Sequence, residues 1–292
     1  AGEFYYRARE RKLGDNFSIR DMFHIPLNKR GIVSTQRYSS LGYPCLYLGN
    51  SIYSCWEEMR RPAFNNLMFS AYKVRNPFRV FDMRIPGDSD YFPDRLIQTI
   101  RRIPLVLACG FVVNNYRDVF KPEYIISQLL LDTIICDSRR RTQREKSVID
   151  LDVIWGVLYT STHISDDFPY GKHLLENIVL PVIESNKSSN HCYYLASLFD
   201  ISKPSCYEYE SLKENTSRMF WDTIDEEKTA SEKVRQQYAQ SKLGYLEERL
   251  KTAQFETLPH IMVGCPTDGI TLDWTGSPVC VEVRSNDHFI IE

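Results

Sequence analysis

The residues of this sequence that could do chemistry together are arginines, carboxylates and hydroxyl side chains. Within residues 31–59 the chain places Arg37 ahead of a turn at Gly42-Tyr43-Pro44, then a short apolar strand, then a helix that carries Glu57 and Glu58. A Gly-Asn-Ser turn joins the strand to this helix, and such connections bring polar side chains to the surface, where binding sites are built. This stretch is therefore a candidate wall of a polar pocket.

Four more side chains could complete such a pocket. Arg7 lies near the start of the chain, Tyr47 lies on the apolar strand, and Tyr159 and Ser161 lie at the end of a later apolar segment. Taken one at a time, each has a simpler role, such as a surface ion pair, a core aromatic or a turn residue, because most polar residues are merely exposed. Their combination is what indicates a site.

The sequence lacks the common motifs of phosphate, dinucleotide, metal and serine-hydrolase sites. It contains no GxGxxG, no GxxxxGK[ST], no HExxH and no GxSxG. The six histidines are isolated from one another, and none of the eight cysteines belongs to a CxxC pair, so the ligand spacings of zinc sites are missing. We therefore expect no metal, and we interpret the cysteines as reduced core residues.

The bulk composition is that of an ordinary globular protein. The 292 residues carry a net charge of −2, and 43% of them are apolar, so neither nucleic acid nor an anionic membrane is an expected partner. The longest apolar run, residues 103–113, is shorter than the roughly 20 residues that a membrane-spanning helix needs. We expect a cytoplasmic protein without membrane contact or direct nucleic-acid binding.

Periodicity divides the chain into a strand-rich part and a helical extension. β-rich patterns predict strands at residues 4–9, 45–48, 67–74, 78–81, 153–161, 173–183 and 190–201. Asn50 and Ser51 predict the N-terminal cap of the helix that follows them, and a further helix begins near Pro122. The composition changes near Lys203-Pro204, and apolar residues at spacings of three and four then predict one amphipathic helix over residues 226–255.

Five segments of the sequence, taken in order, resemble a known family. They are YRAR (6–9), TQRYSSLGYPCLYLGNSIYSCWEE (35–58), FKPEYIISQLLLDTI (120–134), WGVLYTST (155–162) and NIVL (177–180). Together they resemble the RES domain, named for its arginine, glutamate and serine residues. The asparagine that the family usually carries soon after the arginine is replaced here by Ser39 or Ser40. The part of the chain after about residue 200 lies outside the resemblance.

The resemblance implies a fold and an activity. The implied fold class is α+β, with a mixed, largely antiparallel sheet and flanking helices, similar to the ADP-ribosyltransferase toxins. A catalytic domain would cover residues 4–200, and residues 201–292 would form a helical and β-rich extension that packs on the domain or on a partner. The implied activity is cleavage of the nicotinamide–ribose bond of NAD+, by hydrolysis or phosphorolysis, as a toxin or anti-phage effector. NAD+ would be the substrate, inorganic phosphate the co-substrate of phosphorolysis, and no cofactor is expected.

The resemblance also implies a catalytic set of Glu57, Arg37 and Ser161. A carboxylate near the ribose stabilises the oxocarbenium-like transition state of glycosidic cleavage more than it stabilises the ground state. We assign this role to Glu57, although Glu58 follows it directly and alignment alone decides between them. Arg37 would act as a fork for anionic oxygens, because a guanidinium binds them bidentately, and Ser161 would bind the ribose or the carboxamide.

Three further residues are expected to bind the nucleotide. Arg7 would contact the pyrophosphate, Tyr47 would stack on nicotinamide or bond to a ribose, and Tyr159 would contribute its hydroxyl. Two other functions remain open: transfer of ADP-ribose to a macromolecule, and nucleotide sensing without turnover. Because loss of NAD+ would harm the host, the resemblance also implies an antitoxin or regulatory protein, and we expect a homo-oligomer.

Overall fold

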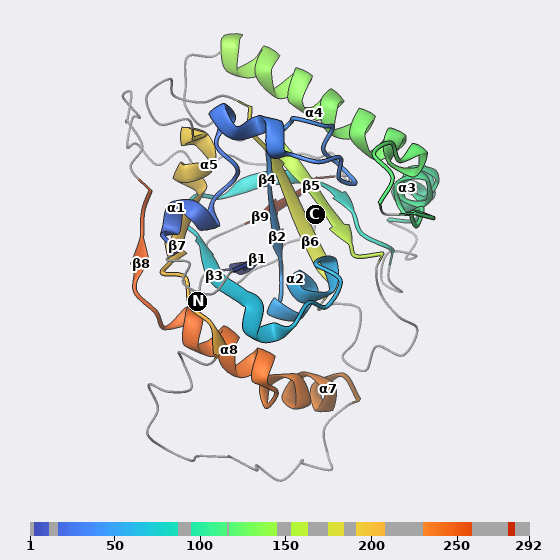
Figure 1. Cartoon of the computed structure of the whole chain (residues 1–292). Coiled ribbons are helices and arrows are strands. Elements are labelled where there is room, and N and C mark those ends of the chain that lie inside the picture. The colour runs from blue at the N-terminus through green and yellow to red at the C-terminus, as the bar shows by residue number, and fades with distance from the viewer. Residues whose placement is uncertain are drawn as a thin grey trace, which may run out of the picture.

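A nine-stranded β-sheet forms the centre of the described part of the molecule (Figure 1). The structure is a computed structural model that describes residues 3–11, 17–86, 95–115, 117–144, 153–162, 175–183, 191–207, 230–258 and 280–283. Within these residues every pair of neighbouring strands is antiparallel except β4 and β5, which are parallel. Helices flank this mixed, mostly antiparallel sheet, which confirms the predicted α+β class.

The strand order is set by crossovers between distant parts of the chain. In sheet order the strands are β8 (Phe255–Glu256), β7 (Phe199–Ser202), β3 (Leu67–Val74), β1 (Phe4–Glu10), β2 (Cys45–Gly49), β6 (Glu176–Pro181), β5 (Ile154–Thr160), β4 (Phe78–Met83) and β9 (Cys280–Val283). β1 and β2 pair at one register position, Tyr6 with Gly49. Beyond that position the two strands no longer pair, although they lie at the centre of the sheet.

Helices surround the sheet (Figure 1). In chain order they are α1 (Ile19–Met22), η1 (Leu27–Ile32), α2 (Ile52–Glu58), η2 (Phe64–Asn66), α3 (Leu96–Cys109), η4 (Pro122–Tyr124), α4 (Ile125–Arg144), α5 (Tyr193–Leu198), α7 (Ala230–Ala239) and α8 (Lys242–Lys251). Leu131 and Ile135 of α4 share an apolar cluster with Val157 of β5 and Val179 of β6. This packing fixes α4 against one face of the sheet, over β5 and β6.

The part of the chain after residue 200 contributes to the same sheet. Leu246 and Leu250 of α8 pack in one cluster with Tyr6 of β1, Ile52 of α2 and Phe69 of β3. β8 and β9 lie at opposite edges of the sheet. The helix that bears Glu57 and Glu58 is therefore packed against the extension as well as against the sheet.

Two predicted elements are wrong in detail. The predicted strand at residues 190–201 is instead helix α5 followed by the short strand β7, because a short apolar run without alternation does not distinguish the two states. The single helix predicted over residues 226–255 is two helices, α7 and α8, and residues 226–229 lie outside the described part. Ser241 accepts a hydrogen bond from the Gly244 N–H and starts the second helix.

Three further features of the sequence can be compared with the structure: a glycine in β5, the cysteines and the apolar segments. A Cβ atom added to Gly156 of β5 would lie 2.0 Å from the Val179 carbonyl oxygen, so glycine is needed where β5 meets β6. Of the six cysteines whose side chains are described, five are buried and none is in a disulfide. No helix in the described ranges is long and apolar enough to cross a bilayer.

Candidate functional site

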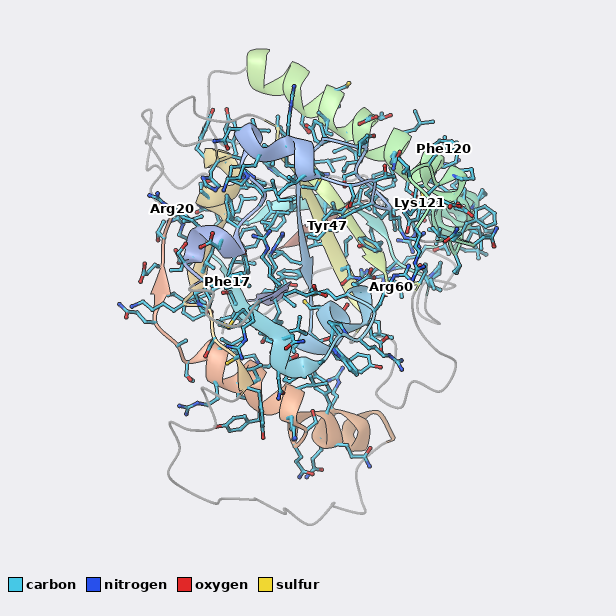
Figure 2. The ribbon with its side chains drawn as sticks, in the orientation of Figure 1. Phe17, Arg20, Tyr47, Arg60, Phe120 and Lys121 are labelled. Carbon is cyan, nitrogen blue, oxygen red and sulfur yellow. The ribbon has the colours of Figure 1, made fainter. Side chains whose placement is uncertain are left out.

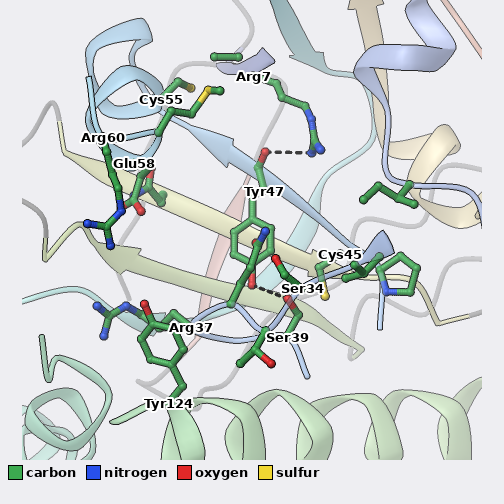
Figure 3. A pocket seen from close by; sticks show the side chains of 18 of the residues that line it. Arg7, Ser34, Arg37, Ser39, Cys45, Tyr47, Cys55, Glu58, Arg60 and Tyr124 are labelled. Carbon is green, nitrogen blue, oxygen red and sulfur yellow. Dashed lines mark hydrogen bonds between the residues drawn. The ribbon is translucent and has the colours of Figure 1, made fainter. Parts of the chain in front are cut away.

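A pocket of about 850 Å³ opens where β1 and β2 stop pairing. Its walls come from both strands, from the C-terminal end of α2, from residues 33–41 and from residues 117–124 (Figure 3). Six lining side chains are cationic and three are acidic: Arg7, Arg9, Arg37, Arg60, Arg117, Lys121, Glu10, Glu58 and Asp118. The excess of cationic over acidic side chains favours an anionic ligand. Two of the cationic residues, Arg60 and Lys121, lie on the same side of Tyr47 in Figure 2.

Glu58 is the carboxylate that faces the pocket from helix α2. The Ser161 hydroxyl donates a hydrogen bond to Glu58 Oε1 at 2.6 Å, and Asn177 Nδ2 donates to the same oxygen at 2.7 Å. Asn177 is oriented in turn by the Ser54 hydroxyl, which donates to Asn177 Oδ1 at 2.6 Å. Ser161 and Asn177 are almost fully buried, so the carboxylate is held in one orientation by groups that are themselves fixed by packing.

Glu57, to which the sequence assigned the carboxylate role, does not line the pocket, whereas its neighbour Glu58 does. Both Glu57 oxygens accept hydrogen bonds from Arg61 Nε, at 2.9 and 2.8 Å. Adjacent residues of an α-helix point about 100° apart, so only one of the two glutamates can face a given wall. Helix α2 turns Glu58 toward β5 and β6, and Glu57 toward its own C-terminal turn.

Arg37 lines the pocket, but its donors bind the protein itself. Its Nη1 donates to the Cys109 carbonyl at 2.7 Å and to the Phe111 carbonyl at 2.9 Å, and its Nη2 donates to the Thr162 hydroxyl. The guanidinium also lies 5.1 Å from the centre of the Tyr124 ring. Arg37 is therefore a fixed positive charge at the end of α3 and not a side chain that rearranges round a ligand.

Arg7, unlike Arg37, makes few hydrogen bonds to the protein. Its Nη1 donates a long 3.3 Å hydrogen bond to the Tyr47 carbonyl, while its Nε is shielded from solvent and has no hydrogen-bond partner. No carboxylate of the described residues forms an ion pair with it. Burial lowers the pKa of Arg7, which is the expected response of a charge without a counter-ion. Such a guanidinium is suited to an anion that enters the pocket.

Aromatic side chains form the rest of the wall. Tyr47 lies between Arg7 and Arg37 in Figure 3, and its hydroxyl is 3.0 Å from the Ser39 hydroxyl. Tyr159 also lines the pocket. Burial raises the pKa of both phenols, and the charge of Glu58 raises the pKa of Tyr159 further. Both are therefore neutral at physiological pH and can serve as hydrogen-bond groups and as flat apolar surfaces.

Of the residues proposed from sequence, Arg7, Arg37, Tyr47 and Tyr159 line one pocket. Ser161 reaches it through its hydrogen bond to Glu58. Glu58, the alternative to Glu57 in the sequence, also lines it, together with three residues that had no expected role: Arg60, Tyr124 and Asn177. Tyr124 and Asn177 lie within the segments that carry the family resemblance, which is the signal that could have found them.

Among the residues that the structure describes, no group of three or more histidine, cysteine, aspartate or glutamate side chains lies close enough together to hold a metal ion. The donors that converge on Glu58 are a hydroxyl and an amide. These groups orient the carboxylate through hydrogen bonds.

Comparison with known proteins gives one informative match. No family model matches the chain, and no solved structure matches it significantly. The chain is 36% identical over 214 residues to the "Putative toxin YopC" of Bacillus subtilis (strain 168), a match that covers 68% of this chain and 46% of that protein. The chain thus spans about half the length of the curated relative it matches. This protein is therefore a distant homologue of a protein described as a toxin.

Proposed function

We propose that this protein cleaves the bond between nicotinamide and ribose in NAD+, as a RES-type enzyme, and that it acts as a toxin by depleting NAD+. The observation that carries the proposal is the fixed carboxylate of Glu58, held by Ser161 and Asn177 in a pocket with a cationic lining. The toxin role draws on the homologue's description, and the assignment to the RES type draws on the five sequence segments.

The chemistry needs few protein groups. When the C–N glycosidic bond breaks, its electron pair leaves with nicotinamide, which becomes neutral, and positive charge develops on the ribose. A preorganised carboxylate stabilises that charge without having to reorient during the reaction. Water or hydrogen phosphate then attacks the anomeric carbon and releases a proton to the solvent. Of the three acidic residues in the lining, Glu58 is the one held by Ser161 and Asn177, and we assign it the stabilisation of the charge on the ribose.

The remaining walls suit the rest of a dinucleotide. The guanidinium of Arg7, which no described carboxylate neutralises, fits a phosphate oxygen. Figure 3 shows Arg7 on one side of Tyr47 and Arg37 with Tyr124 on the other. A ligand that lay across Tyr47 would place its phosphates toward Arg7 and its nicotinamide riboside toward Glu58.

The test compares two isosteric changes at adjacent positions, Glu58→Gln and Glu57→Gln, in purified protein with and without phosphate. A glutamine at the first position would still accept the hydrogen bonds of Ser161 and Asn177, so the fold should survive. Loss of the negative charge there should slow NAD+ consumption by about 100-fold or more. Glu57→Gln should retain measurable turnover. The product identifies the reaction: free ADP-ribose indicates hydrolysis, its phosphorylated form indicates phosphorolysis, and a labelled macromolecule indicates transfer.

Three results would count against the proposal. Wild-type turnover in Glu58→Gln would remove the carboxylate from the mechanism. Label on protein or nucleic acid instead of free ADP-ribose would convert the assignment to a transferase. Binding of NAD+ by the wild type without any consumption would make the pocket a sensor.

A further inference from the structure

Helix α2 ends in two consecutive residues with left-handed backbone conformation. Arg60 has φ 66° and Arg61 has φ 53°, and within the described residues they are the only non-glycine positions with positive φ. The Arg60 N–H donates to the Glu57 carbonyl at 2.8 Å, and the Arg61 N–H donates to the Trp56 carbonyl at 3.0 Å. These two bonds define a Schellman motif, in which the position held by Arg60 is usually glycine because a Cβ atom strains it.

A Glu57–Arg61 ion pair spans this turn. Besides the two bonds from Arg61 Nε, Arg61 Nη2 lies 2.8 Å from Glu57 Oε1. The Arg61 guanidinium lies 5.8 Å from the centre of the Trp56 ring, and Trp56 Nε1 donates to the Pro62 carbonyl at 2.8 Å. Glu57 is buried although it does not enter the pocket. A buried acid of this kind needs a partner. Arg61, one of the two left-handed residues, provides it.

The turn determines where the Arg60 side chain goes. Arg60 lines the pocket together with Met59 and Glu58, and Figure 3 shows its guanidinium on the same side of the pocket as Glu58. Burial raises the pKa of Tyr124, while the charges of Arg37 and Arg60 lower it. Arg60 is exposed, but its charge reaches Tyr124, another residue of the pocket lining.

We infer that the Glu57–Arg61 pair is a positioning device that holds Arg60 and Arg61 in their left-handed conformation, so that Arg60 presents its guanidinium to a phosphate oxygen of the ligand beside Glu58. The chain carries an arginine where glycine would relieve strain, and strain of this kind is retained where a side chain is needed at that point. The inference rests on the proposed function for the identity of the ligand, but not for the geometry of the turn.

The first test separates strain from function at one position. Arg60→Gly should remove the strained Cβ, so the melting temperature should equal or exceed that of the wild type. The same change should weaken ADP-ribose binding by about tenfold, the scale of one lost charge-assisted contact, as measured by calorimetry without any turnover. Arg60→Ala, which keeps the Cβ but not the charge, is the matched control and should lose binding without the gain in stability.

The second test asks whether Glu57 acts through Arg60. Glu57→Gln alone should weaken ADP-ribose binding by a few-fold, because the turn is held less firmly. In the Arg60→Gly background the same change should have no further effect, since residues that act as a unit are not additive. A merely structural role of Glu57 would instead lower binding equally in both backgrounds.

The outcomes distinguish this inference from the proposed function. Wild-type affinity in Arg60→Gly, or equal effects of Glu57→Gln in both backgrounds, would overturn the inference even if NAD+ is consumed. The predicted cycle in a protein that does not consume NAD+ would support the inference and overturn the proposed enzyme. A wild type that binds neither ADP-ribose nor pyrophosphate would overturn the inference, because Arg60 would then meet no phosphate.

Discussion

At the N-terminal end of α2 the backbone donors are satisfied by side chains, whereas at its C-terminal end the backbone is strained. The Ser54 N–H donates to the Ser51 hydroxyl at 2.9 Å, and the Ile52 N–H donates to Glu247 Oε1 at 2.6 Å. The Tyr53 N–H donates to the Tyr238 hydroxyl at 3.4 Å. Each of these bonds satisfies a donor that a helix start otherwise leaves without a partner. This end of the helix is built for stability.

The C-terminal end of α2 is less stable than it could be. Two non-glycine residues in left-handed conformation, Arg60 and Arg61, cost roughly 1–2 kcal/mol each in the absence of compensation. The same end carries Glu58 and Arg60, which line the pocket. The two ends of this short helix therefore differ: contacts from α7 and α8 anchor its start, and the strain lies at the end that lines the pocket.

The largest expected effect on the N-terminal end follows from Glu247→Ala. Glu247 Oε1 accepts from both the Ile52 N–H and the Tyr238 hydroxyl, and Glu247 is buried. Loss of this acceptor leaves two buried donors without a partner, which should lower the free energy of unfolding by about 3 kcal/mol, as measured by urea denaturation. NAD+ turnover per folded molecule should change little, which is the reverse of the expectation for Arg60→Gly.

Glu247→Gln is the control for this change, because glutamine keeps the accepting oxygen. If the alanine and glutamine variants were equally unstable, the lost negative charge and not the lost acceptor would be responsible. If the alanine variant lost turnover as strongly as Glu58→Gln while still folded, the separation between the two ends of α2 would fail.

A smaller effect should appear as a pH dependence. Burial raises the pKa of Glu247 from 4.5 to about 7, although bonds from Tyr238 and Ile52 oppose the shift. A carboxyl group whose pKa is raised on folding contributes stability that is fully present below its unfolded pKa and is lost as the pH rises through its folded pKa. Between about pH 5 and pH 8 the wild type should therefore lose on the order of 2 kcal/mol relative to Glu247→Gln, as measured by denaturation at each pH. Parallel pH profiles for the two proteins would contradict this.

Local features of α2 and of the sheet could be predicted from the sequence. The cap at Ser51 depends on residues within one turn of the helix, and the structure confirms it. Strands with clear β patterns, such as β1 and β3, also appear where expected. Arg7, Arg37, Tyr47 and Tyr159 could be grouped before any coordinates because the family resemblance supplied their order. The roles of these residues remain proposals.

What could not be predicted depends on contacts between distant residues. The orientation of Glu58 is set by Ser161 and Asn177, which lie 103 and 119 positions away, so no local pattern distinguishes it from Glu57. Glu247 lies 195 positions from Ile52, and a helical stripe does not reveal that one of its acids caps another helix. The left-handed turn after α2 could not be predicted for a different reason. Its positions hold arginine, whereas a glycine there would have indicated a turn.

The smallest expected effect comes from Ser51→Ala, and it tests whether capping at this end is local. Loss of an N-cap hydroxyl costs about 1 kcal/mol, so the free energy of unfolding should fall by about that amount, with unchanged NAD+ turnover per folded molecule.

Ser241→Ala is the matched change, because Ser241 caps α8 through a longer 3.2 Å bond from the Gly244 N–H. Since α8 carries Glu247, a strong coupling between the two changes in the double variant would show that α8 and the start of α2 form one cooperative unit. Additive effects would show that each cap stabilises only its own helix, and that Glu247 alone links them.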